Sequence, residues 1–470
     1  MSVTNCWQMR ARFAKALATM YGREVPAYNT LVEVTEEVNQ HVLARDGHDA
    51  ERLGSVDRVS AERHGAIRVG TEAELRDVAR LFAGFGMLPV GFYDLRDASA
   101  SAVPVVATAF RPIDTNELAR NPFRVFTSSL VTDDRRFFDP DLQGELDSFL
   151  SSRTLFPPEA LDLADRAAAE GFLPSAEADR LIELATATLE LSAEPVDRAW
   201  YDRLEAISSV AADIGGVRST HINHLTPRVL DIDELYRRMQ SRGITMIDAI
   251  QGPPRWEGPD VLLRQTSFRA LAEPRRFLDS DGNTYQDSLR VRFGEVEARG
   301  IALTPRGRYL YDTTMIRIDH ATRQSGSPVD AAAIWREMWP ADERGLALAD
   351  LAFFEFTVAA DRPSGTPEAL TAAELLKGGW ITARPIVYED FLPRSAAGIF
   401  QSNLTADGSK DDSLQGAVRS REWMSGVLGR EVLDPNQIYH QQRAQSLAAV
   451  ARELGVSGIE TSQEQLSTPG

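Results

Sequence analysis

Cysteine is almost missing from this chain of 470 residues, because Cys6 is its single thiol. One thiol cannot build an internal disulfide or a cysteine-rich zinc site. Any metal that this chain binds must therefore be held by nitrogen and oxygen atoms. Chains without internal disulfides are typical of reducing compartments, so we expect a cytoplasmic protein.

Long apolar runs are also missing. No stretch approaches the ~18–20 apolar residues that a membrane-spanning helix needs. Near the start of the chain, basic residues interrupt the apolar positions instead of preceding an apolar block, which argues against a signal peptide. We therefore expect no membrane partner.

Positive charge is scarce. Lysine and arginine number 51 against 69 aspartate and glutamate residues, which gives a net charge of −18. Nucleic acids and anionic membranes require a basic face, so neither is an expected partner. A small anionic substrate stays possible, because a few arginines can reverse the field inside one pocket. The glycine-rich motifs of nucleotide sites and the G-x-S-x-G elbow of hydrolases are absent as well.

The hydrophobic pattern predicts an α+β protein, because strand-like and helix-like periodicities alternate along the chain. A strand that carries histidine, followed by a helix and further strands, occurs twice. We predict these segments: an N-terminal helical segment (1–55), a first βαβββ-like module (56–131), a helical insertion (132–214), a second βαβββ-like module (215–330), a mixed segment that closes the active site (331–405), C-terminal helices (406–458) and a polar tail (459–470).

In the first module, residues 63–70 alternate as a strand does, and Thr71 is placed to cap the helix that follows. Strands are predicted at 91–97 and 103–113. In the second module, residues 221–233 begin with a strand, a helix follows, and further strands include one at 308–312.

Histidine is rare, with seven in the chain, so each one is informative. On a strand, His64 and Arg68 share a face with the small residue Ala66, which suits the wall of a pocket. His221 and His224 are three residues apart, so on a strand they point to opposite faces. One of these two histidines is therefore structural.

Two glutamates, Glu295 and Glu297, lie on one face of another predicted strand. Carboxylates in this position are most often solvated. Two histidines and one carboxylate from separate strands nevertheless form the facial triad of non-haem iron(II) oxygenases, which leaves three metal positions open. The three segments together therefore predict a metal site, with either glutamate as a ligand.

Long phrases of the sequence resemble the bacterial 2-oxoadipate dioxygenase/decarboxylase family. The phrases are RHGAIRVGT (63–71), HINHLTPRVLDID (221–233), LLRQTSFRAL (262–271), RFGEVEARGIALTPRGRYLYD (292–312) and YEDFLPRSAAGIFQSNL (388–404). The resemblance implies a vicinal-oxygen-chelate fold similar to hydroxymandelate synthase, in which βαβββ modules form a partly closed sheet around a metal, with large helical insertions. It also implies Fe(2+) and the conversion of 2-oxoadipate and dioxygen to 2-hydroxyglutarate and carbon dioxide in lysine breakdown, with both oxygen atoms incorporated.

The resemblance also assigns site residues. The family's metal ligands fall on His64, on one histidine of HINH and on one glutamate of GEVE, for which we choose His224 and Glu295. These three would also contact a substrate that chelates the metal. Arg68 matches the substrate-binding arginine of the family, and its planar fork suits the distal carboxylate of a 2-oxo dicarboxylate.

Two further substrate contacts are implied at Arg394 and Ser395. Ser395 is the expected catalytic hydrogen-bond donor. Where this chain has Arg394 the family usually has a small apolar residue, so a backbone contact there would persist and a side-chain contact would not.

Two other functions are compatible with such a site. One is a divalent-metal isomerase or lyase of the same fold, and the other is a non-catalytic protein that binds a dicarboxylate. Oxygen consumption with 2-oxoadipate separates the oxygenase from both. The sequence assigns no oligomeric state.

Overall fold

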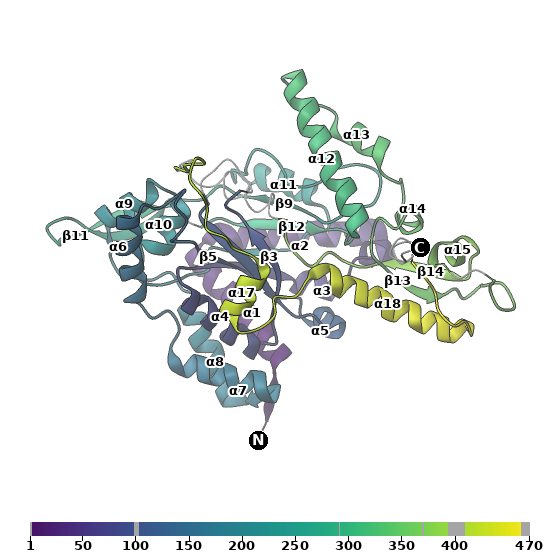
Figure 1. Ribbon diagram of the computed structural model, residues 1–470, viewed down its shortest axis with the longest axis horizontal. Helices are drawn as coiled ribbons and strands as arrows, with labels where there is room; N and C mark the ends of the chain where they lie inside the picture. The colour runs from purple at the N-terminus through teal and green to yellow at the C-terminus, as the bar shows by residue number, and fades with distance from the viewer. Residues whose placement is uncertain (1, 98–102, 291, 369–370, 393–408, 462–470) are drawn as a thin grey trace.

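The computed structural model describes residues 2–97, 103–290, 292–368, 371–392 and 409–461. This part of the chain combines many helices with several small sheets, which confirms the α+β class (Figure 1). None of its helices has both the length and the apolar character that crossing a bilayer requires.

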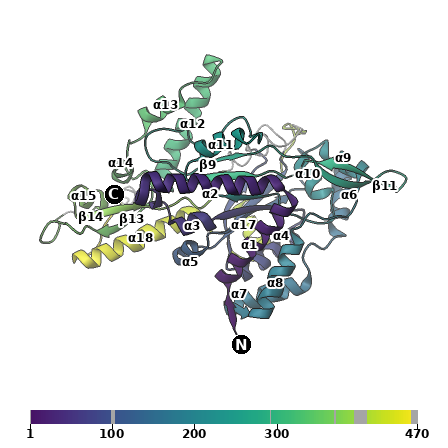
Figure 2. The same cartoon turned by 180° about the vertical axis from the view of Figure 1, so that it is seen from behind.

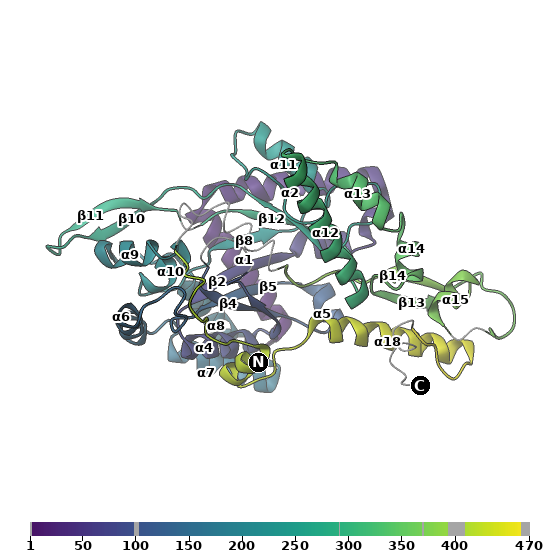
Figure 3. The same ribbon diagram turned by 45° about the horizontal axis from the view of Figure 1, so that its top comes forward.

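A five-stranded sheet with the order β3-β4-β5-β2-β8 lies at the centre (Figure 3). β2 runs parallel to β5 and antiparallel to β8, and the other neighbours are antiparallel. The strands are β2 (Arg63–Val69), β3 (Leu88–Asp94), β4 (Val105–Arg111), β5 (Arg124–Leu130) and β8 (His224–Pro227). The first four belong to one strand–helix–strand–strand–strand unit, whose helix is α4 (Glu72–Gly84).

The prediction of Thr71 as the cap of α4 is confirmed. Its side chain accepts a hydrogen bond from the Glu74 amide, and the Glu74 carboxylate accepts one from the Thr71 amide in return. Strand β5, by contrast, was implied by the βαβββ order predicted for residues 56–131 but was not located in the sequence. All seven of its residues are buried, so its sequence shows no alternation of apolar and polar positions.

A second group of strands continues beside β8. Strand β12 (Glu295–Arg299) pairs antiparallel with β9 (Leu263–Ser267), and the Val229 amide, just past β8, donates to the Glu297 carbonyl at 2.8 Å. Helix α11 (Ile232–Ser241) follows β8. The hairpin of β10 (Glu273–Leu278) and β11 (Thr284–Leu289), with β7 (Val196–Asp197) beside β10, projects at one end of the molecule (Figure 1).

The predicted strand at 308–312 is wrong, because these residues lie in helix α12 (Pro305–Ser325). Thr304 caps this helix and Pro305 occupies its first turn, which are both signals of a helix start. Tyr311 is buried while Tyr309 is 75% exposed, so these two side chains point in different directions, as residues two apart do on a helix and not on a strand.

Helices cover both faces of the central sheet, and α2 runs across the back of the molecule (Figure 2). The N-terminal elements are β1 (Val3–Asn5), α1 (Cys6–Glu24), α2 (Pro26–Asp46), η1 (Gly47–Glu51) and α3 (Val56–Ala61). The next are α5 (Thr115–Arg120), α6 (Pro140–Ser151), α7 (Pro158–Glu170), β6 (Phe172–Pro174), α8 (Ser175–Thr188), α9 (Arg198–Glu205) and α10 (Ser209–Gly215).

The C-terminal part forms its own apolar cluster beside the central sheet. Its elements are α13 (Ala331–Met338), α14 (Glu343–Leu348), β13 (Phe354–Val358), α15 (Ala372–Lys377), β14 (Ile381–Pro385) and α18 (Pro435–Leu454). Helix α17 (Arg421–Leu428) packs instead into the cluster that holds Ile67 and Val69. Strand β2 separates the other two clusters, because Ile67 and Val69 pack into one and Ala66 into the other. His64 and Arg68 alternate with Ile67 and Val69, as the sequence predicted, and so face the Ala66 side.

Candidate metal centre

The pairing of β2 with β8 brings two histidines together. His224 lies opposite Ala66, and His64 lies opposite Thr226. His64 and His224 are therefore diagonal neighbours on one face of the sheet, which is within reach of long side chains. Their ring centroids are 5.3 Å apart.

Glu295 completes the cluster from β12, the strand that follows β8 in space. The Nε2 atom of His64 lies 3.5 Å from Glu295 Oε1, and the Nε2 atom of His224 lies 3.6 Å from Glu295 Oε2. One ligand atom from each of the three residues lies within 4.8 Å of the others. All three side chains are buried.

The chemistry of these donors fits a divalent transition metal. The pKa of His224 lies well below its usual range, mainly because the ring is buried and also because His64 and Arg68 repel a positive charge there. Its ring is therefore neutral, as a metal ligand must be. Neither ring nitrogen of His224 has a hydrogen-bond partner within the described ranges. Two imidazoles and one carboxylate on three strands are the donor set of a facial triad.

Glu295 and Glu297 share one face of β12, as predicted, but they are buried and not solvated. Gln265 on β9 donates a hydrogen bond to the Glu295 carboxylate. The Glu297 carboxylate lies behind the first histidine, with Oε2 3.0 Å from His64 Nδ1. A carboxylate at the second ring nitrogen is the usual support of a metal-binding histidine. Glu295 therefore faces both imidazoles, whereas Glu297 faces the back of one.

A buried network of charges surrounds Glu297. Arg299 donates to its carboxylate at 2.7 and 3.0 Å, and Arg124 lies 3.4 Å from it. Arg124 also binds Glu62 at 2.8 Å and the Glu389 carboxylate. The sequence analysis missed this network, because its members are far apart in the chain and their pairing depends on tertiary contacts. Within the sequence, the charged residues at every second position of EVEAR (295–299) were the one local feature that pointed to this network.

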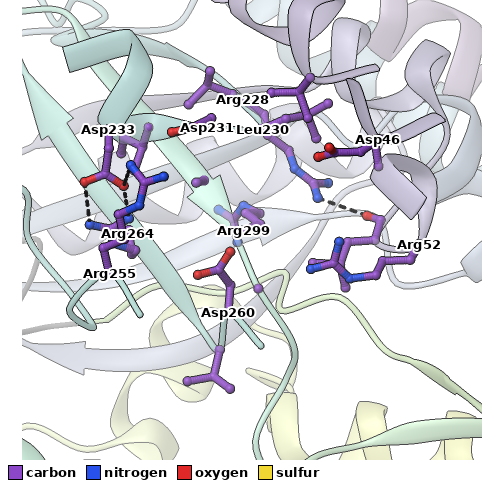
Figure 4. Close-up of a pocket in the computed structure, with 18 of the residues that line it drawn as sticks. Asp46, Arg52, Arg228, Leu230, Asp231, Asp233, Arg255, Asp260, Arg264 and Arg299 are labelled. Atoms are coloured by element: carbon purple, nitrogen blue, oxygen red, sulfur yellow. Dashed lines mark hydrogen bonds and ion pairs between the residues drawn. The ribbon is translucent and has the colours of Figure 1, made fainter. Parts of the chain in front are cut away.

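A cavity of about 220 Å³ lies beside this network, because Arg299 belongs to both (Figure 4). Arg228, which pairs with Glu62 at 2.9 Å, lines it together with Arg299. An ion pair between Arg264 and Asp233 lines it as well. The three residues of the metal cluster do not line it. This cavity is therefore separate from the candidate metal centre.

Arg68 is buried near the other end of β2 and belongs to a second cluster. Its Nη1 atom donates to the carboxylate of Asp213 on α10, and Asn223 Nδ2 donates to the same carboxylate at 2.8 Å. His221 Nε2 lies 3.4 Å from Asp213 Oδ1, and burial lowers the pKa of His221 to about 4. The two histidines of HINH thus contact different clusters. The sequence analysis expected them on opposite faces of one strand, but β8 begins at His224 and His221 lies before it.

Aromatic rings pack against the two histidines of the candidate metal cluster. Phe391 lies 5.0 Å from the His64 ring and 5.0 Å from Phe126, and Phe293 lies 5.3 Å from the His224 ring. These aromatic contacts were not predicted. Arg394 and Ser395 lie outside the described residues, which stop at 392 on this side.

Comparison with known proteins gives consistent matches over most of the chain. The family model of 2-oxoadipate dioxygenase/decarboxylase matches residues 13–403. A Mycobacterium tuberculosis protein of that name is 55% identical over 432 residues, which are 92% of this chain and 95% of that protein. A Pseudomonas putida protein of that name is 40% identical over 471 residues, covering 96% and 98%. The crystal structure of the hydroxyglutarate synthase in complex with 2-oxoadipate from Pseudomonas putida has a TM-score of 0.79 at 37% identity and covers 97% and 100%.

The charge network should be essential for stability. Arg124→Met should lower the free energy of unfolding by about 3 kcal/mol, because it removes one cation from buried carboxylates that stay in place. Urea denaturation at neutral pH measures this change. Arg180→Met, which removes an exposed partner of Glu159, should leave the unfolding curve nearly unchanged, because water screens that pair. Equal effects of the two substitutions would contradict a special role for the buried network.

Proposed function

Because this chain belongs to the 2-oxoadipate dioxygenase/decarboxylase family, we propose that it converts 2-oxoadipate and dioxygen to 2-hydroxyglutarate and carbon dioxide. The observation that carries this proposal is the buried cluster of His64, His224 and Glu295. We propose Fe(2+) as its metal, a role in lysine catabolism and a cytoplasmic location.

The proposed metal would be held by His64 Nε2, His224 Nε2 and one Glu295 oxygen. When bound, iron(II) would supply the redox chemistry with dioxygen, and three ligands on one face leave positions for the substrate and dioxygen. The protein supplies geometry. Gln265 fixes the Glu295 carboxylate, and Glu297 orients the His64 ring.

We propose that the fold is of the vicinal-oxygen-chelate type. Two units support this assignment. One runs β2-α4-β3-β4-β5, and the other comprises β8, α11, β9 and β12. Each unit places a histidine near the start of its first strand, and the two first strands lie side by side at the cluster. The predicted segment boundaries, from 1–55 to 459–470, remain proposals of the same kind.

The other residues of the pocket would bind and shield the substrate. Arg68 would hold the distal carboxylate, since a buried guanidinium makes strong charge-assisted hydrogen bonds with a planar carboxylate. Phe126, Phe293 and Phe391 would keep water away from the reacting end. Ser395 is proposed as a hydrogen-bond donor to the substrate, with a contact at Arg394 beside it.

A titration with iron(II) under anaerobic conditions, followed by 2-oxoadipate and then air, tests the proposed reaction. We expect one dioxygen consumed for each 2-hydroxyglutarate and carbon dioxide formed. Turnover without oxygen consumption would favour a metal-dependent isomerase or lyase. Binding of 2-oxoadipate without turnover would favour a dicarboxylate-binding protein.

The metal ligands can be tested by substitution. His64→Ala, His224→Ala and Glu295→Ala should each abolish turnover and greatly weaken iron binding, because each removes one of three donors. Glu297→Ala should keep measurable turnover and weaken iron binding by about 10–100-fold, as loss of an orienting residue does. His221→Ala should retain iron. Iron titration and oxygen uptake measure both properties, and iron binding that survives Glu295→Ala but not Glu297→Ala would show that our choice of glutamate is wrong.

Arg68 should distinguish diacids from monoacids. Arg68→Met keeps much of the stem but leaves a distal carboxylate without its charged partner, a loss on the order of 2–5 kcal/mol. For 2-oxoadipate this corresponds to roughly 30- to several-thousand-fold in kcat/KM. Arg68→Lys should rescue activity in part, because a point charge cannot form the fork. A 2-oxo monoacid of equal length should be a poor substrate and should lose less; equal losses would instead place Arg68 in the support of the metal centre.

A further inference from the structure

A buried carboxylate holds Arg68, the residue proposed to bind the distal carboxylate of the substrate. Asp213 is 5% exposed, and it accepts hydrogen bonds from Arg68 Nη1 and from Asn223 Nδ2. His221 lies against the other carboxylate oxygen, at 3.4 Å, and also 3.1 Å from Asn223 Nδ2. Partners on several sides leave Asp213 little freedom to move, so the guanidinium that it binds is held from a rigid point.

The position of this anchor relative to the metal cluster is set by the sheet. Arg68 follows His64 by four residues on one face of β2, which is ~13 Å of strand. Ala66 lies between them on the same face and has a short side chain. Asp213 reaches the Arg68 end from α10, so it is supplied by the helices between the two strand units.

We propose that Asp213 is a positioning residue that fixes the Arg68 guanidinium and thereby selects the length of the 2-oxo diacid. This inference rests on the proposed function, in which Arg68 binds the distal carboxylate while the 2-oxo acid end lies at the metal cluster. Asp213 itself need not touch the substrate.

The physical reason is that the substrate must bind at both ends at once, with its 2-oxo acid end at the metal cluster and its distal carboxylate at Arg68. An arginine side chain is long and flexible, so an unanchored guanidinium could follow the carboxylates of diacids of several lengths. An anchored one meets the distal carboxylate at one distance from the metal cluster. A diacid shorter by one methylene then either loses the fork or shifts its reacting end, and a misplacement of about 1 Å can reduce the rate by about 100-fold.

The experiment compares 2-oxoadipate with 2-oxoglutarate, which is one methylene shorter. The kcat/KM for 2-oxoadipate divided by that for 2-oxoglutarate should fall by about tenfold or more in Asp213→Asn. The reason is that one methylene changes kcat/KM by about 10–200-fold in a pocket that discriminates length. Iron affinity should stay within about threefold of the native value. Asp213→Glu keeps the buried ion pair and moves the carboxylate by one methylene, so its ratio should fall as well.

A matched control is Asp134→Asn. Asp134 is equally buried but holds Arg96 and Arg136, so its substitution should lower stability without changing the substrate ratio. An unchanged ratio in Asp213→Glu and in folded Asp213→Asn would overturn the inference, as would an equal fall in Asp134→Asn. The Arg68→Met kinetics test the proposed function separately. A diacid-specific loss in Arg68→Met with unchanged ratios in the Asp213 variants would reject the role of Asp213 alone.

Discussion

The register between β2 and β8 is the constraint on which the candidate site depends. Pairing of Ala66 with His224 makes His64 and His224 diagonal neighbours on one face, at a spacing that one small ion can bridge. A slip by one residue would turn either histidine to the opposite face. Glu295 reaches the two histidines because β12 lies beside β8. The hydrogen bond from the Val229 amide to the Glu297 carbonyl holds β12 in that place.

Burying so much charge around this register requires compensation. Carboxylates and guanidinium groups alternate in the interior, where Glu297 binds Arg299 and Arg124, and Arg124 in turn binds Glu62. Each ion would be very unfavourable alone in a medium of low dielectric constant, and it is tolerated because each has partners. The arrangement places a carboxylate behind His64 in a fixed position, so the network that stabilises the core also holds a candidate metal ligand.

The helices between the two strand units contribute to the site as well as to the core. Their apolar residues pack with Ala66 and Phe126 on the face of the sheet where His64 and Arg68 lie. From the same helices Asp213 reaches Arg68. The two ends of the proposed substrate pocket thus have different supports, with charged strands behind the metal cluster and an inserted helix behind the arginine.

The sequence by itself determined local features and family membership. Alternation placed His64 and Arg68 on one face of β2, Thr71 marked the start of α4, and long phrases indicated the family that the comparisons confirm. Tertiary structure decided which histidine of HINH lies beside His64, which glutamate faces both imidazoles, and which charges surround them. It also located β5, whose complete burial removes any alternation, and it showed helix α12 where a strand was predicted at 308–312. The physical reason is range: periodicity and capping act within a few residues, whereas strand register and buried ion pairs join residues hundreds of positions apart.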